Sequence, residues 1–337
     1  MARLTEDANG VYVIAVTPFT DDGALDLASI DSMVDFYEGA GVTGLTVLGQ
    51  LGEAPKLTAE ESRTVVERVL KRLDGRLPVV VGVSAPWLAP MNELAEAVMG
   101  EGAAGVMVAP PWTVKTDDQA FAFYQSVGEA LGDTPFVLQD YPLTTNVTIA
   151  PKVIERIVND VPNCVMLKHE DWPGLSKISA LRAASDKGAM RRISILCGNG
   201  GLFLPEEMGP WRRWRNDRLC YPEMMVGVVE AYAAGNPDRA HAIFDAYLPL
   251  ARYEQQQGIG LASRKYVLAK RGVIKSATLR KPGAKLDTGY CRCRAVAGAP
   301  GHPPQGDRGV THRRKSEAAG SSLRRCSASR WLCPSRP

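Results

Sequence analysis

The first candidate for chemistry in this chain is a lysine at the end of an apolar run. Lys168 closes the sequence Cys-Val-Met-Leu-Lys over residues 164–168. Burial of an ammonium group is costly, and it favours the neutral amine, which is the nucleophilic form. Such an amine can attack a ketone and form a Schiff base. The alternative is a lysine that leaves the sheet and pairs with Glu170 or Asp171, and residue type alone favours neither interpretation.

Tyr141 favours the chemical interpretation of Lys168. This tyrosine lies at the end of the preceding strand-like run, Phe136–Pro142. In adjacent parallel strands the two side chains could reach the same mouth of a barrel, and a phenol beside an amine can carry protons while a carbinolamine forms and collapses. The alternative for Tyr141 is an aromatic side chain that only caps the strands. The residues after Lys168, His169–Asp171, could tune or line the mouth, but each is expected to be a solvated loop group.

Two glycine-containing segments follow strand-like runs and are candidates for substrate binding. Gly49–Gly52 comes directly after the second run, and such a turn can direct several backbone N–H groups towards one carboxylate. Gly198 and Asn199 follow the seventh run and could form another wall of the same site. Each segment could also be a plain β-to-α turn, and for Gly198 and Asn199 the plain turn is slightly favoured.

The elements that would position these residues alternate along the chain. Seven short runs are rich in β-forming residues, and most are continuously apolar, which is typical of parallel strands covered on both faces. These runs are Val11–Phe19, Gly44–Gly49, Pro78–Val83, Gly105–Pro110, Phe136–Pro142, Cys164–Glu170 and Arg192–Asn199. A helix is predicted over Ala59–Leu73, with Thr58 and Glu61 as its capping box. The alternation predicts an α/β fold, a (β/α)8 TIM barrel followed by a C-terminal helical extension.

The expected domain organisation is a barrel over residues 1–222, a helical region over 223–287 and a tail over 288–337. The formal net charge of +3 is close to balance and does not indicate a nucleic-acid or membrane-surface partner, although basic residues are concentrated towards the C-terminus. The N-terminus lacks a signal-peptide pattern, and no apolar run approaches the ~20 residues of a membrane span. The expected localisation is therefore cytoplasmic.

The cysteines do not indicate a metal site. Cys164 and Cys197 lie inside apolar runs and are expected to be small buried side chains. Cys291 and Cys293 lack the spacing of a zinc or redox motif. No metal ligand is therefore assigned in this sequence.

The region where the eighth strand is needed has no strand character in the printed sequence. Residues 211–220 combine tryptophan and arginine where a core element is expected. Compatible codons read one nucleotide later encode Gly-Gly-Asp-Gly-Ala-Met-Thr-Gly-Tyr, which suits a turn and a strand. The same shift after Asp287 gives an amphipathic helix. We hypothesise frameshifts that damage the eighth strand and the last helix.

Two alternatives to the frameshift hypothesis follow from the same segments. The tail could be a real disordered basic segment that binds an acidic partner, including a nucleic acid. The barrel could also remain open at the eighth strand, and the chain would then be a non-catalytic or misfolded protein.

The residues Gly49-x-x-Gly52-Glu53, Tyr141 and Lys168, in this order, resemble those of the dihydrodipicolinate synthase/N-acetylneuraminate lyase family. Val16–Phe19 is similar to the opening strand of that family, and the resemblance covers about residues 9–286. It implies a barrel lyase of the class I aldolase type that forms a homo-oligomer, a dimer or a tetramer. It also implies a Schiff base between Lys168 and pyruvate or a related 2-oxo acid, with Tyr141 as the proton relay. Gly49–Gly52 would bind the substrate carboxylate, and no cofactor is implied.

The chain departs from the synthase members of that family at three places. Gln50 and Leu51 stand where the synthases have two threonines, and Trp112 lies in the loop where they have a relay tyrosine. Tyr141–Val147 lacks the arginine that binds their second substrate. Gln50, Leu51 and Trp112 are retained as expected substrate-binding residues. The departures favour an aldolase or dehydratase that acts on a sugar-derived or otherwise hydroxylated 2-oxo acid.

Overall fold

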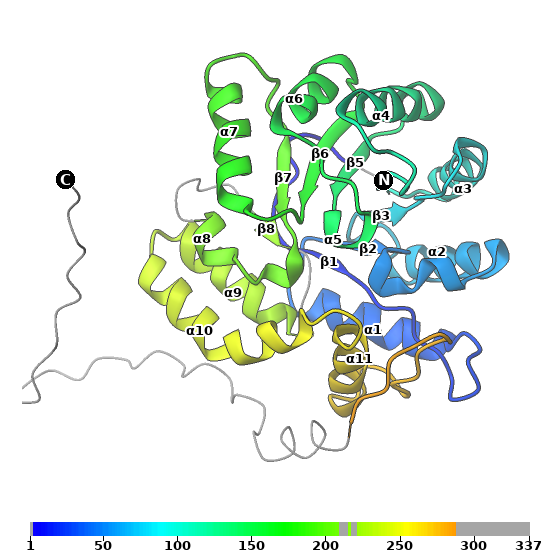
Figure 1. Ribbon diagram of the computed structural model, residues 1–337. Helices are drawn as coiled ribbons and strands as arrows, with labels where there is room; N and C mark the ends of the chain where they lie inside the picture. The colour runs from blue at the N-terminus through cyan, green and yellow to red at the C-terminus, as the bar shows by residue number, and fades with distance from the viewer. Residues whose placement is uncertain (1–2, 209–214, 217–220, 288–337) are drawn as a thin grey trace, which may run out of the picture. The chain divides into compact units, whose positions relative to one another are not determined.

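Eight parallel strands follow one another in the sheet in the same order as in the sequence (Figure 1). The computed structural model describes residues 3–208, 215–216 and 221–287. The strands are β1 (Tyr12–Ile14), β2 (Gly44–Val47), β3 (Val79–Gly82), β4 (Gly105–Val108), β5 (Phe136–Asp140), β6 (Cys164–His169), β7 (Ser194–Cys197) and β8 (Arg215–Asn216). Strand β8 pairs with β7 and also contacts β1, so the two edges of the sheet approach each other. This arrangement is consistent with a TIM barrel.

Helices follow most of the strands and lie outside the sheet (Figure 1). They are α1 (Leu27–Gly39), α2 (Ala59–Leu73), α3 (Leu88–Gly100), α4 (Asp117–Leu131), α5 (Pro142–Thr145), α6 (Pro151–Asp160), α7 (Gly174–Asp186), α8 (Leu204–Met208), α9 (Pro222–Ala233), α10 (Pro237–Glu254) and α11 (Gly260–Lys270). The last three, α9 to α11, lie within the expected helical region 223–287 except for Pro222, the first residue of α9. None of the described helices combines the length and the apolar character that crossing a bilayer requires.

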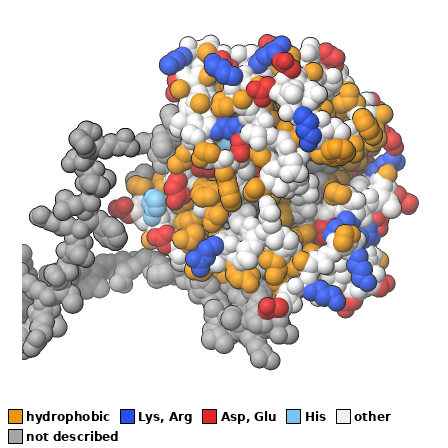
Figure 2. Space-filling model, viewed as in Figure 1, with side chains coloured by type: hydrophobic (Ala, Val, Ile, Leu, Met, Phe, Trp, Pro, Cys, Tyr) orange, Lys and Arg blue, Asp and Glu red, His pale blue; other side chains and the backbone are white. Residues whose placement is uncertain are grey.

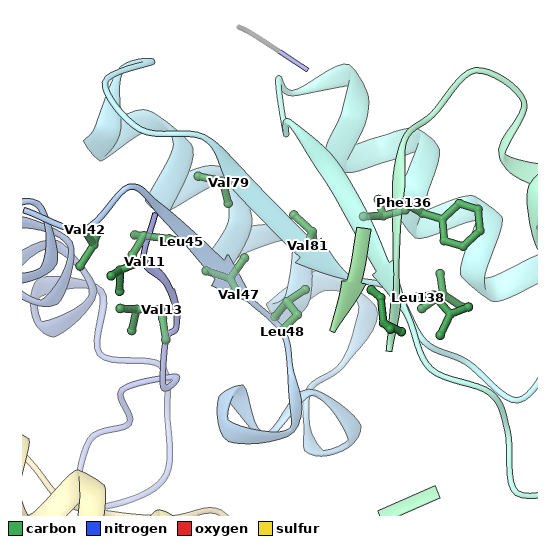
Figure 3. Close-up of a cluster of buried hydrophobic side chains, with 14 of the residues drawn as sticks. Val11, Val13, Val42, Leu45, Val47, Leu48, Val79, Val81, Phe136 and Leu138 are labelled. Atoms are coloured by element: carbon green, nitrogen blue, oxygen red, sulfur yellow. The ribbon is translucent and has the colours of Figure 1, made fainter. Parts of the chain in front are cut away.

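Alternate residues of β3, β4 and β5 belong to two different hydrophobic clusters. Val79 and Val81 of β3 pack in the cluster that includes the helices, and Figure 3 shows both side chains. Val80 belongs to a second cluster that contains residues of β1, β3, β4, β5, β6 and β7. Because side chains alternate between the two faces of a strand, the second cluster fills the inside of the curled sheet. Residues two positions beyond it, such as Lys168 after Met166, share this inner face.

The seven strands predicted from the sequence are all present, although each is shorter than predicted. The predicted helix Ala59–Leu73 has the predicted limits, and both halves of its capping box form. Glu61 N donates to Thr58 Oγ1 at 3.1 Å, and Thr58 N donates to Glu61 Oε2 at 2.9 Å. These two bonds satisfy backbone donors that the first turn of a helix leaves without partners.

The eighth strand is short but lies where the barrel requires it. Leu196 and Cys197 of β7 pair with Arg215 and Asn216 of β8, although residues 211–220 showed no strand pattern. The remaining residues of the suspected frame error, 209–214 and 217–220, lie outside the described part of the chain, as does the tail 288–337. The frameshift hypothesis and the proposed domain limits therefore stay predictions.

The surface of the described residues carries both signs of charge. On the face shown in Figure 2, basic and acidic side chains are interspersed around the edge. Helices α1 and α2 are joined by ion pairs of Arg68 with Asp31 and Arg72 with Asp35, and Arg76, which follows α2, pairs with Glu38 of α1. Much of the basic charge of α2 is therefore matched by acidic charge on its neighbour.

Candidate active site

A buried lysine and a buried carboxylate meet at the C-terminal end of β6. Lys168 and Glu170 are each 0% exposed, and Lys168 Nζ lies 3.1 Å from Glu170 Oε2. Gln139 of β5, which pairs with Lys168 in the sheet, donates its Nε2 to the same oxygen at 2.7 Å. The expectation that Glu170 is a solvated loop group is wrong. The pairing of Lys168 with Glu170, the alternative considered from the sequence, is present, but it lies inside the sheet and away from solvent.

Gly198 provides the space that the Glu170 side chain occupies. A Cβ atom on Gly198 would lie 2.1 Å from Glu170 Cγ and 2.6 Å from the carbonyl oxygen of His169. The φ angle of Gly198 is −89°, so the close approach of its neighbours, and not the backbone conformation, requires glycine. Asn199 is buried and donates Nδ2 to the Glu170 carbonyl at 3.1 Å. Both residues therefore position Glu170, a role that differs from the plain turn favoured from the sequence.

Tyr141 lies on the same face of the sheet as Lys168. Gln139 is opposite Lys168 in the β5–β6 register, and Tyr141 follows Gln139 by two residues. Glu170 N donates to the Asp140 carbonyl at 2.8 Å, which extends the pairing to the ends of both strands. Tyr141 then becomes the N-cap residue of α5. The two residues predicted to be catalytic thus share the C-terminal mouth of the sheet.

A cavity of about 360 Å³ lies at this mouth. Its lining includes Leu51 after β2, Tyr141 after β5, Trp172 after β6 and Asn199 after β7, together with the segment that joins α10 to α11. Lys168 itself does not line the cavity, because its side chain is fully buried on the strand that precedes these loops. Loops at the carboxyl ends of the strands are where barrel enzymes place their active sites.

The segment Gly49–Gly52 is a tight turn beside this cavity. Residues 50–52 form one turn of 3-10 helix, and Gly49 precedes it with extended backbone angles. The N–H groups of Gln50 and Leu51 begin the turn, and N–H groups at this position have no partner within a helical turn. The Leu51 side chain lines the cavity, whereas the Gln50 side chain is exposed. Binding of the substrate carboxylate by this turn stays a prediction.

Glu53 connects this turn to the C-terminal part of the chain. The Glu53 carboxylate is buried and accepts from Lys265 Nζ at 2.7 Å, from Lys56 Nζ at 2.8 Å and from the Arg280 N–H at 3.1 Å. Burial lowers the pKa of Lys265 to about 8, although the negative charge of Glu53 opposes that shift. Sequence reasoning missed Lys265 and Arg280 because more than 200 residues separate them from Glu53.

A second charged cluster lies behind β5 and β6. His169 is 1% exposed, and its Nδ1 lies 3.4 Å from Asp140 Oδ2. Lys177 of α7 bridges Asp140 and Asp171, at 2.7 Å from a carboxylate oxygen of each. His169 and Asp140 alternate with the inward Lys168 and Gln139, so they point to the helix side of the sheet. The expectation that His169 is solvated is therefore wrong, and its surroundings indicate a supporting role.

Trp112 lies apart from the cavity in this chain. Its side chain is 67% exposed, and Lys115 Nζ lies over its ring at 5.8 Å from the centroid. It does not belong to the residues that line the mouth cavity, so its predicted contact with substrate stays a prediction. Among the described residues, no three His, Cys, Asp or Glu side chains gather in an arrangement that could hold a metal ion.

A curled parallel sheet with a buried lysine at the C-terminal end of β6 has the features of a Schiff-base lyase of the class I aldolase type. The family model of the dihydrodipicolinate synthetase family matches residues 7–292. The chain therefore belongs to this family, as its motifs predicted, and the prediction of a lyase is confirmed at the level of the family.

Individual relatives carry two different enzyme names. The chain is 28% identical to the L-2-keto-3-deoxyarabonate dehydratase of Azospirillum brasilense, over 82% of this chain and 89% of the relative. It is 30% identical to the 4-hydroxy-tetrahydrodipicolinate synthase of Thiobacillus denitrificans, over 72% of this chain and 80% of the relative. The fold is similar to a crystal structure of the dihydrodipicolinate synthase from Rhodopseudomonas palustris, with a TM-score of 0.84 and 52% identity over 87% of this chain and 97% of that one.

Proposed function

We propose that this protein is a Schiff-base lyase that acts on a small, hydroxylated 2-oxo acid by aldol cleavage or by dehydration. The observation that carries the proposal is the fully buried amine of Lys168, 3.1 Å from the Glu170 carboxylate. Burial of an ion pair costs desolvation free energy, and such costly buried charges occur often at functional sites. Transfer of one proton from Lys168 to Glu170 gives a neutral amine and a carboxylic acid, the pair that the chemistry requires.

The first step forms the Schiff base. The neutral amine of Lys168 attacks the ketone carbon, and the resulting carbinolamine loses its hydroxyl as water when Tyr141 supplies a proton. The iminium that remains withdraws electrons from the neighbouring carbon C3. Tyr141 lines the cavity beside β6 and can exchange protons with the bound substrate there.

The second step differs between the two reactions. In dehydration, loss of a proton from C3 gives an enamine, which expels the C4 hydroxyl as water with a proton from Glu170. In aldol cleavage, the C4 hydroxyl returns a proton to Tyr141, the C3–C4 bond breaks to release a carbonyl fragment, and the electrons of the bond form the enamine. The enamine then takes up a proton at C3 from Glu170 and becomes an iminium again. In either case water then hydrolyses the iminium and releases the product from Lys168.

We propose that substrate selection depends on the positions where this chain differs from the synthases. The N–H groups of Gln50 and Leu51 would bind the substrate carboxylate, with Gly49 and Gly52 shaping the turn. Leu51 places an apolar side chain at the cavity. Because leucine has no hydroxyl group, this position cannot relay a proton. We infer a reaction other than dihydrodipicolinate synthesis, and the likeness to a dehydratase of a keto-deoxy sugar acid supports a hydroxylated substrate.

Borohydride trapping tests the proposal directly. The purified chain is incubated with pyruvate and sodium borohydride, and the modified peptide is mapped by mass spectrometry. We expect a reduced adduct on Lys168 and none in a K168A variant. Lys177 and Lys265 are also buried beside carboxylates, so their unmodified peptides serve as internal controls. A folded protein without an adduct, or with its adduct on another lysine, would contradict the proposal.

A further inference from the structure

One wall of the mouth cavity comes from α10, α11 and the loop between them. The loop contains three successive glutamines, Gln255–Gln257, and all three line the cavity. The chain then turns back closely on the end of α10, because a Cβ atom on Gly260 would lie 2.1 Å from the Glu254 carbonyl oxygen. This close turn brings Arg264 of α11 next to Glu254 of α10.

Arg264 and Glu254 form a buried ion pair in this wall. Arg264 is 2% exposed and Glu254 is 4% exposed, and both line the cavity. Arg264 donates Nε and Nη2 to Glu254 Oε2, at 3.2 and 3.1 Å. Its remaining nitrogen, Nη1, is buried without a hydrogen-bond partner among the described residues. A buried donor without a partner is costly, and a ligand group that accepts a hydrogen bond would satisfy it.

The charges of this wall favour an uncharged ligand group as the hydrogen-bond acceptor for Arg264 Nη1. Glu254 already neutralises Arg264, and Arg264 is the single basic side chain among the described residues that line this cavity. A ligand carboxylate at Nη1 would lie close to the Glu254 carboxylate and be repelled by it. A hydroxyl can accept from Nη1 and also donate to a carboxylate or amide oxygen. Glu254 and the side-chain amides of Gln255–Gln257 offer such oxygens on the same wall.

We propose that Arg264 and Glu254 recognise a hydroxyl at the end of the substrate that is remote from its 2-oxo acid group. The inference rests on the proposed Schiff-base function and narrows its substrate class. The cavity of about 360 Å³ exceeds what a three-carbon acid fills. The substrate class is therefore a 2-oxo acid whose carbon chain carries a hydroxyl beyond C4, such as 4,5-dihydroxy-2-oxopentanoate.

Two substrates that differ in one hydroxyl test the inference. The value of kcat/KM is measured for 4,5-dihydroxy-2-oxopentanoate and for 4-hydroxy-2-oxopentanoate, which lacks the terminal hydroxyl. The wild-type chain should prefer the dihydroxy acid by roughly 10- to 100-fold. The double variant E254Q/R264M removes both charges, so that neither is left buried without its partner. In this variant the ratio of the two kcat/KM values should be close to one, mainly through a change in KM. R264K keeps the charge pair but removes the Nη1 donor, and it should shift the ratio in the same direction.

A matched pair and a third substrate make the outcomes distinct. Arg271 and Glu223 join α11 to α9 outside the cavity, so E223Q/R271M should keep the wild-type ratio. An unchanged ratio in E254Q/R264M and in R264K, with trapping on Lys168 intact, would overturn the inference. The third substrate is 4-hydroxy-2-oxopentanedioate, which ends in a carboxylate. If E254Q/R264M and R264K lost activity on this substrate only, the assignment to a hydroxyl would be overturned. Absence of trapping in the wild-type chain would instead remove the proposed function itself.

Discussion

Glu170 is the residue whose position changes the interpretation of this site most. From the sequence it follows Lys168 by two positions and could belong to a solvated loop, yet in the structure it is fully buried beside the amine. Gln139 donates to its carboxylate, Asn199 donates to its backbone carbonyl, and Gly198 leaves room for its side chain. Such support is typical of a side chain whose orientation matters for proton transfer.

A substitution at Glu170 tests this role. E170Q keeps the size of the side chain but removes its ability to donate and accept a proton in catalysis. We expect kcat for a 4-hydroxy-2-oxo acid to fall by about 100-fold or more, with a smaller change in KM, because general acid–base groups contribute this much to rate. Steady-state kinetics over a range of pH provide the measurement. E155Q on the outer helix α6 is the control, and an unchanged kcat in E170Q would refute the assignment.

At the scale of elements, the C-terminal helix α11 reaches the turn that is proposed to bind the substrate carboxylate. Lys265 of α11 contacts Glu53 directly after this turn, and its Nζ lies 4.3 Å from the centre of the Phe19 ring. Helix α11 therefore contributes to the site twice, through Lys265 at the turn and through Arg264 at the cavity wall. Under the proposed function, the position of this helix would affect both ends of the substrate.

The lowered pKa of Lys265 predicts how stability depends on pH. In the folded chain the pKa is about 8, against an ordinary value of 10.5. Between these values the unfolded chain binds a proton that the folded chain does not, so the free energy of unfolding rises with pH across this window. Below about pH 8 both states hold the proton, and the dependence ends.

Comparison with K265M isolates this contribution, because methionine cannot titrate. Urea unfolding of both chains should show that the stability of the wild-type chain relative to K265M increases as the pH is raised from about 8 towards 10.5. Other titrating groups are common to both proteins and cancel in the difference. If the stability difference between the two chains stayed constant or shrank with rising pH, burial would not destabilise the protonated form of Lys265 in the folded state.

At the scale of the whole molecule, closure of the sheet depends on its shortest strand. Strand β8 has two residues, and both are paired with β7. Barrel strands of this type usually bring apolar residues to the interior, and Arg215 and Asn216 are poorly suited to that role. The frameshift hypothesis offers a reason for this mismatch, because the alternative codons give a more suitable turn and strand.

A replacement variant tests the frameshift hypothesis at this scale. Residues 211–220 are replaced by Gly-Gly-Asp-Gly-Ala-Met-Thr-Gly-Tyr-Ala, the product of the alternative codons with the frame restored before Tyr221. We expect the melting temperature to rise by several degrees, at about 2–4 °C for each kcal/mol in a domain of this size. Thermal unfolding followed by circular dichroism provides the measurement. A lower melting temperature, or gene sequence reads that match the printed frame, would reject the hypothesis.

Much of the barrel could be predicted because the required signals are local. Continuous apolar runs identified seven strands, and Thr58 with Glu61 identified the start of α2 to the residue. Lys168 and Tyr141 were found because each ends such a run, and strand ends share one edge of a parallel sheet. Strand β8 was not recognised, because pairing with β7 and contact with β1 decide it and its residues have no strand pattern.

The amino-acid sequence by itself determined the alternation of strands and helices, the family, and the strand ends that carry Lys168 and Tyr141. Only the tertiary structure decided that Glu170 is buried beside Lys168, that Gly198 makes room for it, and that α11 supplies Arg264 and Lys265 to the site. The physical reason is the range of the interactions. Propensity, periodicity and capping act over a few neighbouring residues, whereas burial and ion pairing depend on which distant segments the closed fold brings together.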